Sequence, residues 1–101
     1  MIIQQQANQV GQWLCVIERK QSGQTFCDLQ VLGTADDNSV DVWNAGVANG
    51  ILVLGDNVTI KRPKLSRLHV GIEVRGHNVK IEDVEADLIS GDVIQGNGNS
   101  L

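Results

Sequence analysis

Aromatic residues are scarce in this chain of 101 residues: two Trp and one Phe, with no Tyr. Without large rings, a core has to be filled by Val, Ile and Leu, which suit strands. Glycine is abundant, at 11 residues. The length fits one domain with one core. The composition therefore favours a single all-β domain.

Positive charge and long apolar runs are also lacking. The chain has eight basic and twelve acidic residues, which gives a formal charge of −4. A protein that binds nucleic acid by neutralising phosphates needs the opposite sign. No apolar run approaches the ~20 residues that cross a bilayer, and residues 1–12 lack the features of a secretion signal. We expect no nucleic-acid partner and no membrane span, and the localisation stays open.

Cysteine occurs only at Cys15 and Cys27, each in an apolar, strand-like context ("WLCVI", "TFCDL"). Two cysteines do not make a disulfide framework, and no CxxC motif is present. We interpret both as small core residues in a reducing compartment.

An internal repeat is the strongest signal in the chain. A step of 21 residues carries "GDNVTIKRP", from Gly55, onto "GHNVKIEDV", from Gly76, and seven of the eleven positions in 50–60 are identical in 71–81. Apolar residues alternate within each copy, which is typical of strands. In a weaker third copy, Val93 takes the repeat position that Ile72 holds in the second copy. The repeat predicts a parallel β-helix in which each copy contributes two short strands and a longer return to the next coil, with coils ~4.8 Å apart.

Charge supports this register. The segment "KRPK" (61–64) falls over "EDVE" (82–85), because the same 21-residue step relates them. Like charges in neighbouring strands would oppose the stacking. The step instead predicts three opposite pairs: Lys61 with Glu82, Arg62 with Asp83, and Lys64 with Glu85.

Asparagine recurs at the turn of each copy, at Asn57, Asn78 and Asn99. Asn tolerates left-handed backbone, and its amide both donates and accepts hydrogen bonds. We predict an asparagine ladder that bonds from coil to coil. The preceding glycines, Gly55 and Gly76, suit positive φ.

The chain divides into three parts. Residues 1–12 are interpreted as an N-terminal capping or flexible segment, 13–48 as irregular first coils with an insertion near "GTADDN", and 49–101 as regular coils, about three to four coils in all. The last copy is incomplete, so we expect the natural protein to continue.

The segments "NGILVLGDNVTIKRP" and "VGIEVRGHNVKIEDVEADLISGDVIQGNGNS" resemble the right-handed parallel β-helix proteins of the pectate-lyase-like superfamily. That superfamily includes polysaccharide lyases, glycoside hydrolases, epimerases and bacteriophage tailspikes. The resemblance implies a right-handed β-helix with an extended carbohydrate-binding face. Its motifs are specific for the fold and not for one function.

Four residues are candidates for carbohydrate binding. Trp43 offers a ring on which a sugar can stack, and Asp36 and Asp37 lie in the inserted loop. Asp92 stands where the repeat has Gly71, and a broken local rule can mark a site. Each candidate also has a structural alternative, in which Trp43 packs in the fold, Asp36 and Asp37 are only solvated, and Asp92 forms a turn.

No catalytic set is recognisable, so the sequence leaves open whether the full-length protein is an enzyme. His69 and His77 occupy different repeat positions, which disfavours a shared metal site. No cofactor is evident, and Ca²⁺ is expected only in coils that this chain lacks.

The sequence favours the N-terminal portion of a β-helix that binds or processes polysaccharide. The alternative is a noncatalytic structural, adhesin or tailspike module that assembles with other chains, including further copies of itself, through the exposed ends of its stack.

Overall fold

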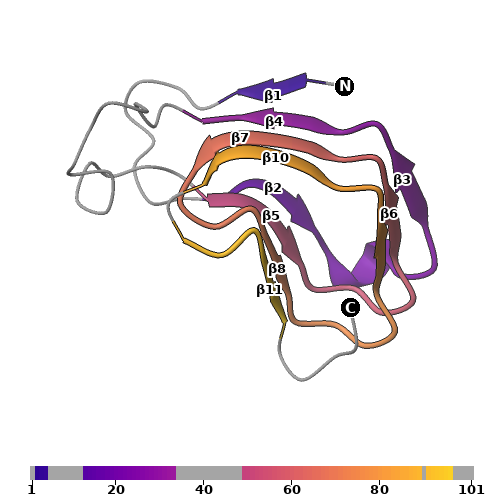
Figure 1. The fold of residues 1–101 in the computed structure, drawn as a ribbon. Coiled ribbons are helices and arrows are strands. Elements are labelled where there is room, and N and C mark those ends of the chain that lie inside the picture. Colours follow the sequence, from indigo (N-terminus) through magenta and orange to yellow (C-terminus); the bar gives the residue numbers. More distant parts are fainter. Residues whose placement is uncertain (1, 5–12, 34–48, 90, 97–101) are drawn as a thin grey trace.

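The computed structural model describes residues 2–4, 13–33, 49–89 and 91–96. In these ranges the chain is built from short strands and one 3-10 helix, η1 (Arg19–Gln21), as Figure 1 shows. The strands are β1 (Ile2–Gln4), β2 (Trp13–Ile17), β3 (Thr25–Cys27), β4 (Gln30–Leu32), β5 (Asn49–Val53), β6 (Thr59–Lys61), β7 (Lys64–Leu68), β8 (Ile72–Val74), β9 (Lys80–Glu82), β10 (Glu85–Ile89) and β11 (Ile94–Gly96). The described part is all-β, as predicted. No helix within it is long and apolar enough to cross a membrane.

The strands form three parallel sheets. Sheet A has the order β1-β4-β7-β10, sheet B the order β11-β8-β5-β2, and sheet C the order β3-β6-β9. Successive strands belong to different sheets, so one circuit of the chain adds one strand to each sheet (Figure 1). The first circuit is β2–β3–β4, the second β5–β6–β7 and the third β8–β9–β10. This arrangement is compatible with the predicted β-helix.

The 21-residue register is confirmed between the second and third circuits. Ile51 pairs with Ile72, and Ile60 pairs with Ile81. Sheet A keeps the same step between β7 and β10. The step from the first circuit is longer, since Cys15 pairs with Ile51. The step from the first circuit to the second therefore does not follow the 21-residue repeat.

Two details of the predicted register are wrong. Each circuit contains three strands and not two, because the predicted return segments form β7 and β10. In the third copy it is Ile94, and not Val93, that pairs with Ile72. Because Ile89 still pairs with Leu68, the chain takes up one extra residue between Ile89 and Ile94. This shift stacks Ile94 on Ile72, which itself lies on Ile51, and it leaves Val93 38% exposed.

Alternation along the strands builds the core. Inward side chains of one circuit lie on the equivalent side chains of the next, and each fully buried aliphatic side chain contributes about 1.5–3 kcal/mol relative to exposure. The buried apolar residues are Ile17, Leu29, Val31, Ile51, Val53, Val58, Ile60, Leu65, Leu68, Ile72, Val74 and Val79.

The two cysteines face opposite ways. Cys15 is half-buried and packs against the core, as predicted. Cys27 is exposed, so its assignment to the core was wrong. In β3 it is Phe26 that pairs with the buried Ile60, whereas Cys27 pairs with Lys61 on the outer side.

The turn glycines serve a different purpose from the one predicted. Neither Gly55 nor Gly76 has a positive φ. The left-handed residues are instead Asn57 and Asn78, with φ of 56° and 58°. A Cβ on Gly76 would stand 1.8 Å from the carbonyl oxygen of Gly55. Glycine is needed at position 76 because the backbones of two circuits meet there.

Candidate functional site

Four of the predicted residues, Asp36, Asp37, Trp43 and Asn99, lie outside the described residues. Asp92 is described and exposed, just before β11. Its carbonyl oxygen accepts a hydrogen bond from the Gly71 N–H at 3.0 Å. Because Ile94 pairs with Ile72, Val93 and not Asp92 stands level with Gly71. The predicted replacement of Gly71 by Asp92 is therefore corrected by one position.

At the turn between sheets B and C, an aspartate carries a side-chain hydrogen bond between circuits. The His77 N–H donates to Oδ1 of Asp56 at 2.8 Å. The Asn57 N–H donates to the carbonyl oxygen of His77, also at 2.8 Å. The exposed Asn57 and Asn78 supply left-handed backbone to this turn. The sequence prediction missed Asp56, because its side chain bonds to a residue 21 positions away and the repeat has a histidine, His77, at the equivalent position.

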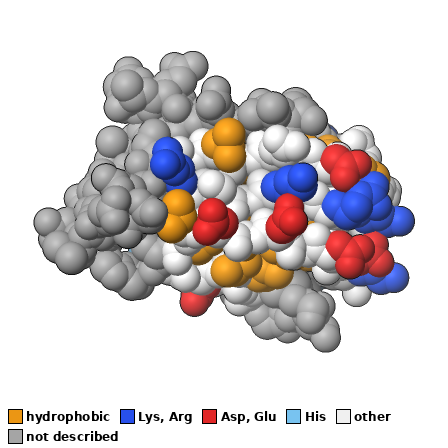
Figure 2. Space-filling view, turned by 45° about the horizontal axis from the view of Figure 1, so that its top comes forward, with side chains coloured by type: hydrophobic (Ala, Val, Ile, Leu, Met, Phe, Trp, Pro, Cys, Tyr) orange, Lys and Arg blue, Asp and Glu red, His pale blue; other side chains and the backbone are white. Residues whose placement is uncertain are grey.

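The outer face of sheet A brings polar side chains from three circuits together. Alternation buries Val31 and Leu65 and turns their neighbours outward. These outward residues, together with Leu65 and Ala86, line a shallow depression of about 330 Å³, which we call the sheet A hollow. Figure 2 shows acidic and basic groups interspersed over the described surface. The outward residues are Gln30, Leu32, Lys64, Ser66, Glu85 and Asp87.

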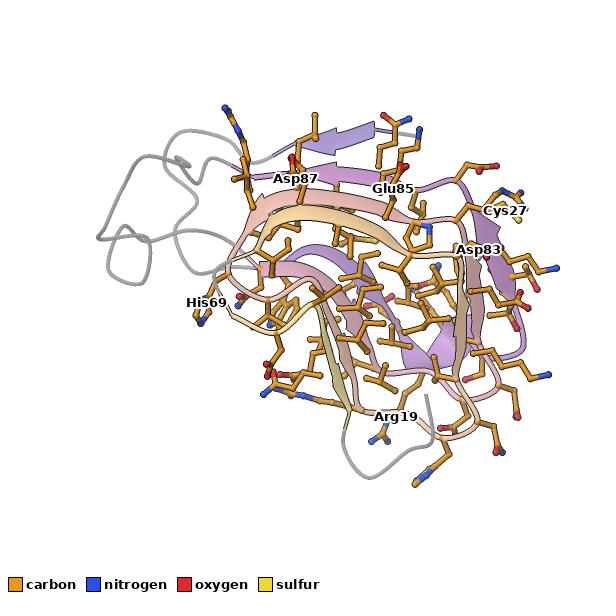
Figure 3. All side chains as sticks on the ribbon, in the orientation of Figure 1. Arg19, Cys27, His69, Asp83, Glu85 and Asp87 are labelled. Atoms are coloured by element: carbon orange, nitrogen blue, oxygen red, sulfur yellow. The ribbon has the colours of Figure 1, made fainter. Side chains whose placement is uncertain are left out.

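The sheet A hollow holds two carboxylates and one ammonium group. Glu85 and Asp87 project from the same strand (Figure 3), and residues two apart on a strand share a face about 6.5 Å apart. Lys64 Nζ lies 3.8 Å from Glu85 Oε2, and their side chains remain 60% and 74% exposed. An exposed pair of this kind is weak. Both groups can therefore exchange this contact for hydrogen bonds to a ligand.

A second depression, of about 450 Å³, lies at the corner between sheets C and A. Arg62 forms a two-pronged ion pair there with Asp28, with Nε–Oδ1 at 2.8 Å and Nη2–Oδ2 at 3.2 Å. Arg62 is not paired with Asp83, so that prediction was wrong. Asp28 occupies the same corner one circuit earlier. The 21-residue step did not predict this pair, because Asp28 and Arg62 are 34 residues apart. The other two predicted pairs are present, Lys61–Glu82 at 4.0 Å and Lys64–Glu85 at 3.8 Å.

The Arg62–Asp28 pair predicts an acid dependence of stability. The hydrogen bond from Arg62 lowers the pKa of the Asp28 carboxyl from its ordinary value. A lowered folded-state pKa stabilises the fold above the unfolded value of about 3.9, and this contribution is lost as the pH falls through the folded value. We expect Asp28→Asn to lower the urea midpoint at pH 7 and to make no difference near pH 2.

Arg62→Gln is the matched variant, because it removes the other half of the same pair. It should reproduce the pH dependence of Asp28→Asn. A loss in Asp28→Asn that is equally large at pH 7 and pH 2 would contradict the assignment.

The cysteines predict a difference in thiol reactivity. Burial raises the pKa of the Cys15 thiol, whereas Cys27 is exposed on β3. Because the thiolate is the reactive form, we expect a thiol reagent to modify Cys27 at least tenfold faster than Cys15. Cys27→Ser and Cys15→Ser variants assign the two phases. In urea the two thiols should react at equal rates. Equal modification rates of Cys15 and Cys27 in the folded chain would contradict this arrangement.

The remaining polar groups are dispersed. A depression of about 200 Å³ on sheet B is lined by Glu73, Val74, Arg75, Gln95 and Gly96, and Arg75 pairs with Glu73 in it. His69 follows β7, whereas His77 lies in the turn before β9. Within the described ranges, no three His, Cys, Asp or Glu side chains gather closely enough to hold a metal ion.

No family model, curated protein or solved structure matches this chain. The sheet A hollow is the candidate site because it joins polar side chains from three successive circuits on one face.

Proposed function

We propose that this chain forms part of a right-handed parallel β-helix whose sheet A face binds polysaccharide. The support for a β-helix is the regular passage through three parallel sheets with a repeated 21-residue register. Right-handedness follows from the strong preference of parallel strand connections for that hand. The resemblance of the repeat to pectate-lyase-like proteins points in the same direction.

The observation that carries polysaccharide binding is the composition of the sheet A hollow. Carboxylates accept hydrogen bonds from sugar hydroxyls. The ammonium group of Lys64 and the amide N–H groups of Gln30 donate hydrogen bonds to sugar oxygens. Leu32 offers apolar surface to the carbon face of a sugar ring. Because strands repeat every ~4.8 Å, the same face offers contacts at successive levels. An open, shallow face of this kind suits an extended polymer.

The charge of the hollow favours a neutral polymer. Among the described residues that line the hollow, Glu85 and Asp87 are the two acids and Lys64 is the one cation. An anionic polymer would bring its carboxylates close to two like charges. We therefore propose binding of a neutral, hydroxyl-rich polysaccharide, without cleavage by this chain alone.

Titration of the chain with neutral and acidic oligosaccharides, followed by calorimetry or NMR, tests this function. We expect neutral oligomers to bind and Asp87→Ala to weaken binding about fivefold, the equivalent of one lost hydrogen bond of ~1 kcal/mol. Glu82→Ala is the matched control, since Glu82 is an exposed acid outside the hollow. Binding that is lost in Trp43→Ala but unchanged in Asp87→Ala would move the site to the inserted loop. Absence of binding at millimolar oligosaccharide would reject the function.

A second function, a noncatalytic structural module, is favoured by one observation. Strands β9, β10 and β11 each end a sheet, with no further described strand beside them. Sheet edges are sites where other chains add strands. Sedimentation over a hundredfold concentration range tests self-assembly, and a monomer throughout would reject assembly through these edges by copies of this chain.

A further inference from the structure

We propose that the sheet A hollow is the first of two subsites in one groove, and that a bound neutral polysaccharide runs along the strands into the corner between sheets C and A. The inference rests on the proposed function of the hollow, and it adds the direction of the polymer and the place of its next sugar. The second subsite, which we call the corner subsite, consists of Asp28, Arg62 and Asp83.

The two depressions on this side of the molecule adjoin. Lys64 and Glu85 line both the sheet A hollow, of about 330 Å³, and the corner depression, of about 450 Å³. In the third circuit, Asp87 lines the hollow alone and Asp83 lines the corner depression alone. Asp87, Glu85 and Asp83 follow one another along the chain toward the corner (Figure 3). The two depressions therefore lie end to end in the direction of the strands.

The outer face of sheet A continues around this corner because the alternation of side chains is not interrupted there. Arg62 and Lys64 are exposed, and they flank Pro63, which is fully buried. One circuit earlier, the exposed Asp28 precedes the buried Leu29 in the same way. Residues two apart share a face of an extended chain. The corner and the hollow therefore belong to one outward surface.

The middle of the groove lies on an interior strand. Lys64 and Ser66 belong to β7, which pairs with β4 on one side and with β10 on the other. At the corner, the Arg62 side chain bonds to Asp28 of the first circuit, and its backbone N–H donates to the Glu82 carbonyl oxygen of the third. The outward side chains of the second circuit are thus exposed on the face of the sheet, and this exposure does not depend on where a sheet ends.

The corner subsite offers donors and acceptors side by side. Arg62 carries more N–H donors than the two that bond to Asp28. The two side chains remain 53% and 64% exposed, so the other donors and the free lone pairs of the carboxylate can reach a ligand. Adjacent hydroxyls of a sugar ring both donate and accept hydrogen bonds. The planar Arg62–Asp28 pair therefore suits a sugar that presents two neighbouring hydroxyls.

The charge of the corner depression favours the same class of polymer as the hollow. Each cation there already holds an acid, Arg62 with Asp28 and Lys64 with Glu85. Asp83 adds a further negative charge. An acidic sugar would meet these carboxylates at short range. One neutral, hydroxyl-rich polymer can therefore occupy both subsites.

A polymer that runs along the strands makes contacts different from those of a polymer that runs along the stack. Along the stack it would meet one row of outward residues at successive levels, such as Gln30, Lys64 and Glu85, and would miss the corner subsite. Along the strands it fills the hollow first and then passes the Lys64–Glu85 pair to reach Asp83. Only in the second case does affinity for a long oligomer depend on the corner.

Calorimetric titration of the full chain with cello- and manno-oligosaccharides, from disaccharide to hexasaccharide, tests the direction. The disaccharide should fill the hollow, where Leu32 offers apolar surface. We expect Asp87→Ala to weaken binding at every length about fivefold. Asp83→Gly should weaken the hexasaccharide about fivefold, the equivalent of one lost hydrogen bond, and leave the disaccharide unchanged. Glycine is chosen because Asp83 has φ of 55°, which glycine adopts without strain.

Asn78→Gly is the matched control for Asp83→Gly. Asn78 is exposed and has φ of 58°, and it lines neither depression. The variant makes the same backbone change away from the groove, so binding should be unchanged at every length. Circular dichroism verifies that both glycine variants keep their strands.

Three results would overturn the proposal. Hexasaccharide binding that depends on Asp87 but not on Asp83 would reject the direction and leave the function of the hollow standing. Equal weakening of disaccharide and hexasaccharide by Asp83→Gly would make the corner the first subsite. No binding of either series at millimolar concentration would reject the function of the hollow, and the direction with it.

Discussion

Replacing Ile72 by aspartate should lower the free energy of unfolding by about 4 kcal/mol or more. Ile72 is fully buried in β8 and pairs with Ile51 on one side and Ile94 on the other. The substitution removes an aliphatic side chain from the core and buries a carboxylate with no partner, which costs about 3–5 kcal/mol for a broken buried charge. Domains of this size unfold with about 5–15 kcal/mol. Urea unfolding measured by circular dichroism should show a large loss or an unfolded chain at the outset.

Val16→Asp is the matched control, because it makes a similar change at an apolar residue of the same sheet that is 42% exposed. It should change stability by about 0.5 kcal/mol or less. If Ile72→Asp does not fold, Ile72→Ala supplies a graded value of about 2–5 kcal/mol. Similar losses at positions 72 and 16 would show that the two side chains are not on opposite sides of the sheet.

Gly76→Ala should also destabilise the chain strongly, by about 3 kcal/mol or more. The added Cβ would lie 1.8 Å from the carbonyl oxygen of Gly55 and 2.6 Å from its carbonyl carbon. Relief requires two backbones to separate, and overpacking of this kind costs about 1–3 kcal/mol or more. The same displacement weakens the bond from the Asn57 N–H to His77 beside it. Denaturant unfolding provides the measurement.

Gly23→Ala distinguishes crowding from backbone conformation. Gly23 has φ of +82°, and nothing lies within 4 Å of its missing Cβ. The cost there arises from left-handed backbone alone, about 1–2 kcal/mol. A smaller loss for Gly76→Ala than for Gly23→Ala would contradict the close approach of the two circuits.

The register of the second and third circuits could be predicted because both circuits contain the same repeated sequence motif. Ile60 over Ile81 and Lys64 over Glu85 both follow from one 21-residue step. The alternating apolar residues of the repeat, such as Ile51 and Val53, are buried. Repetition supplies the pairing partner directly, a piece of information that a single strand lacks.

The same reasoning failed where the period changes. Asp28 lies 34 residues before Arg62 and could not be recognised as its partner, although the structure joins them at 2.8 Å. Cys27 was assigned inward by its apolar neighbours, whereas pairing with Lys61 turns it outward. The extra residue between Ile89 and Ile94 shifted the third copy by one position.

The candidate site was largely invisible to the sequence. Asp87, Gln30 and Ser66 are not among the candidates that the sequence predicts. They meet because β4, β7 and β10 are neighbours in one sheet despite their separation in the chain. The candidates Trp43, Asp36 and Asp37 lie outside the described residues.

The sequence by itself determined the all-β class, the 21-residue step and the inward side of the repeated strands, because period and repetition are local properties of the chain. Only the tertiary structure decided that the return segments form a third sheet, that Arg62 bonds to Asp28, and that polar residues of three circuits share one outer face. A repeat does not reveal that the return segments pair as strands, and the first circuit, which contributes Asp28 and Gln30, precedes the second by 34 residues and so follows no repeat.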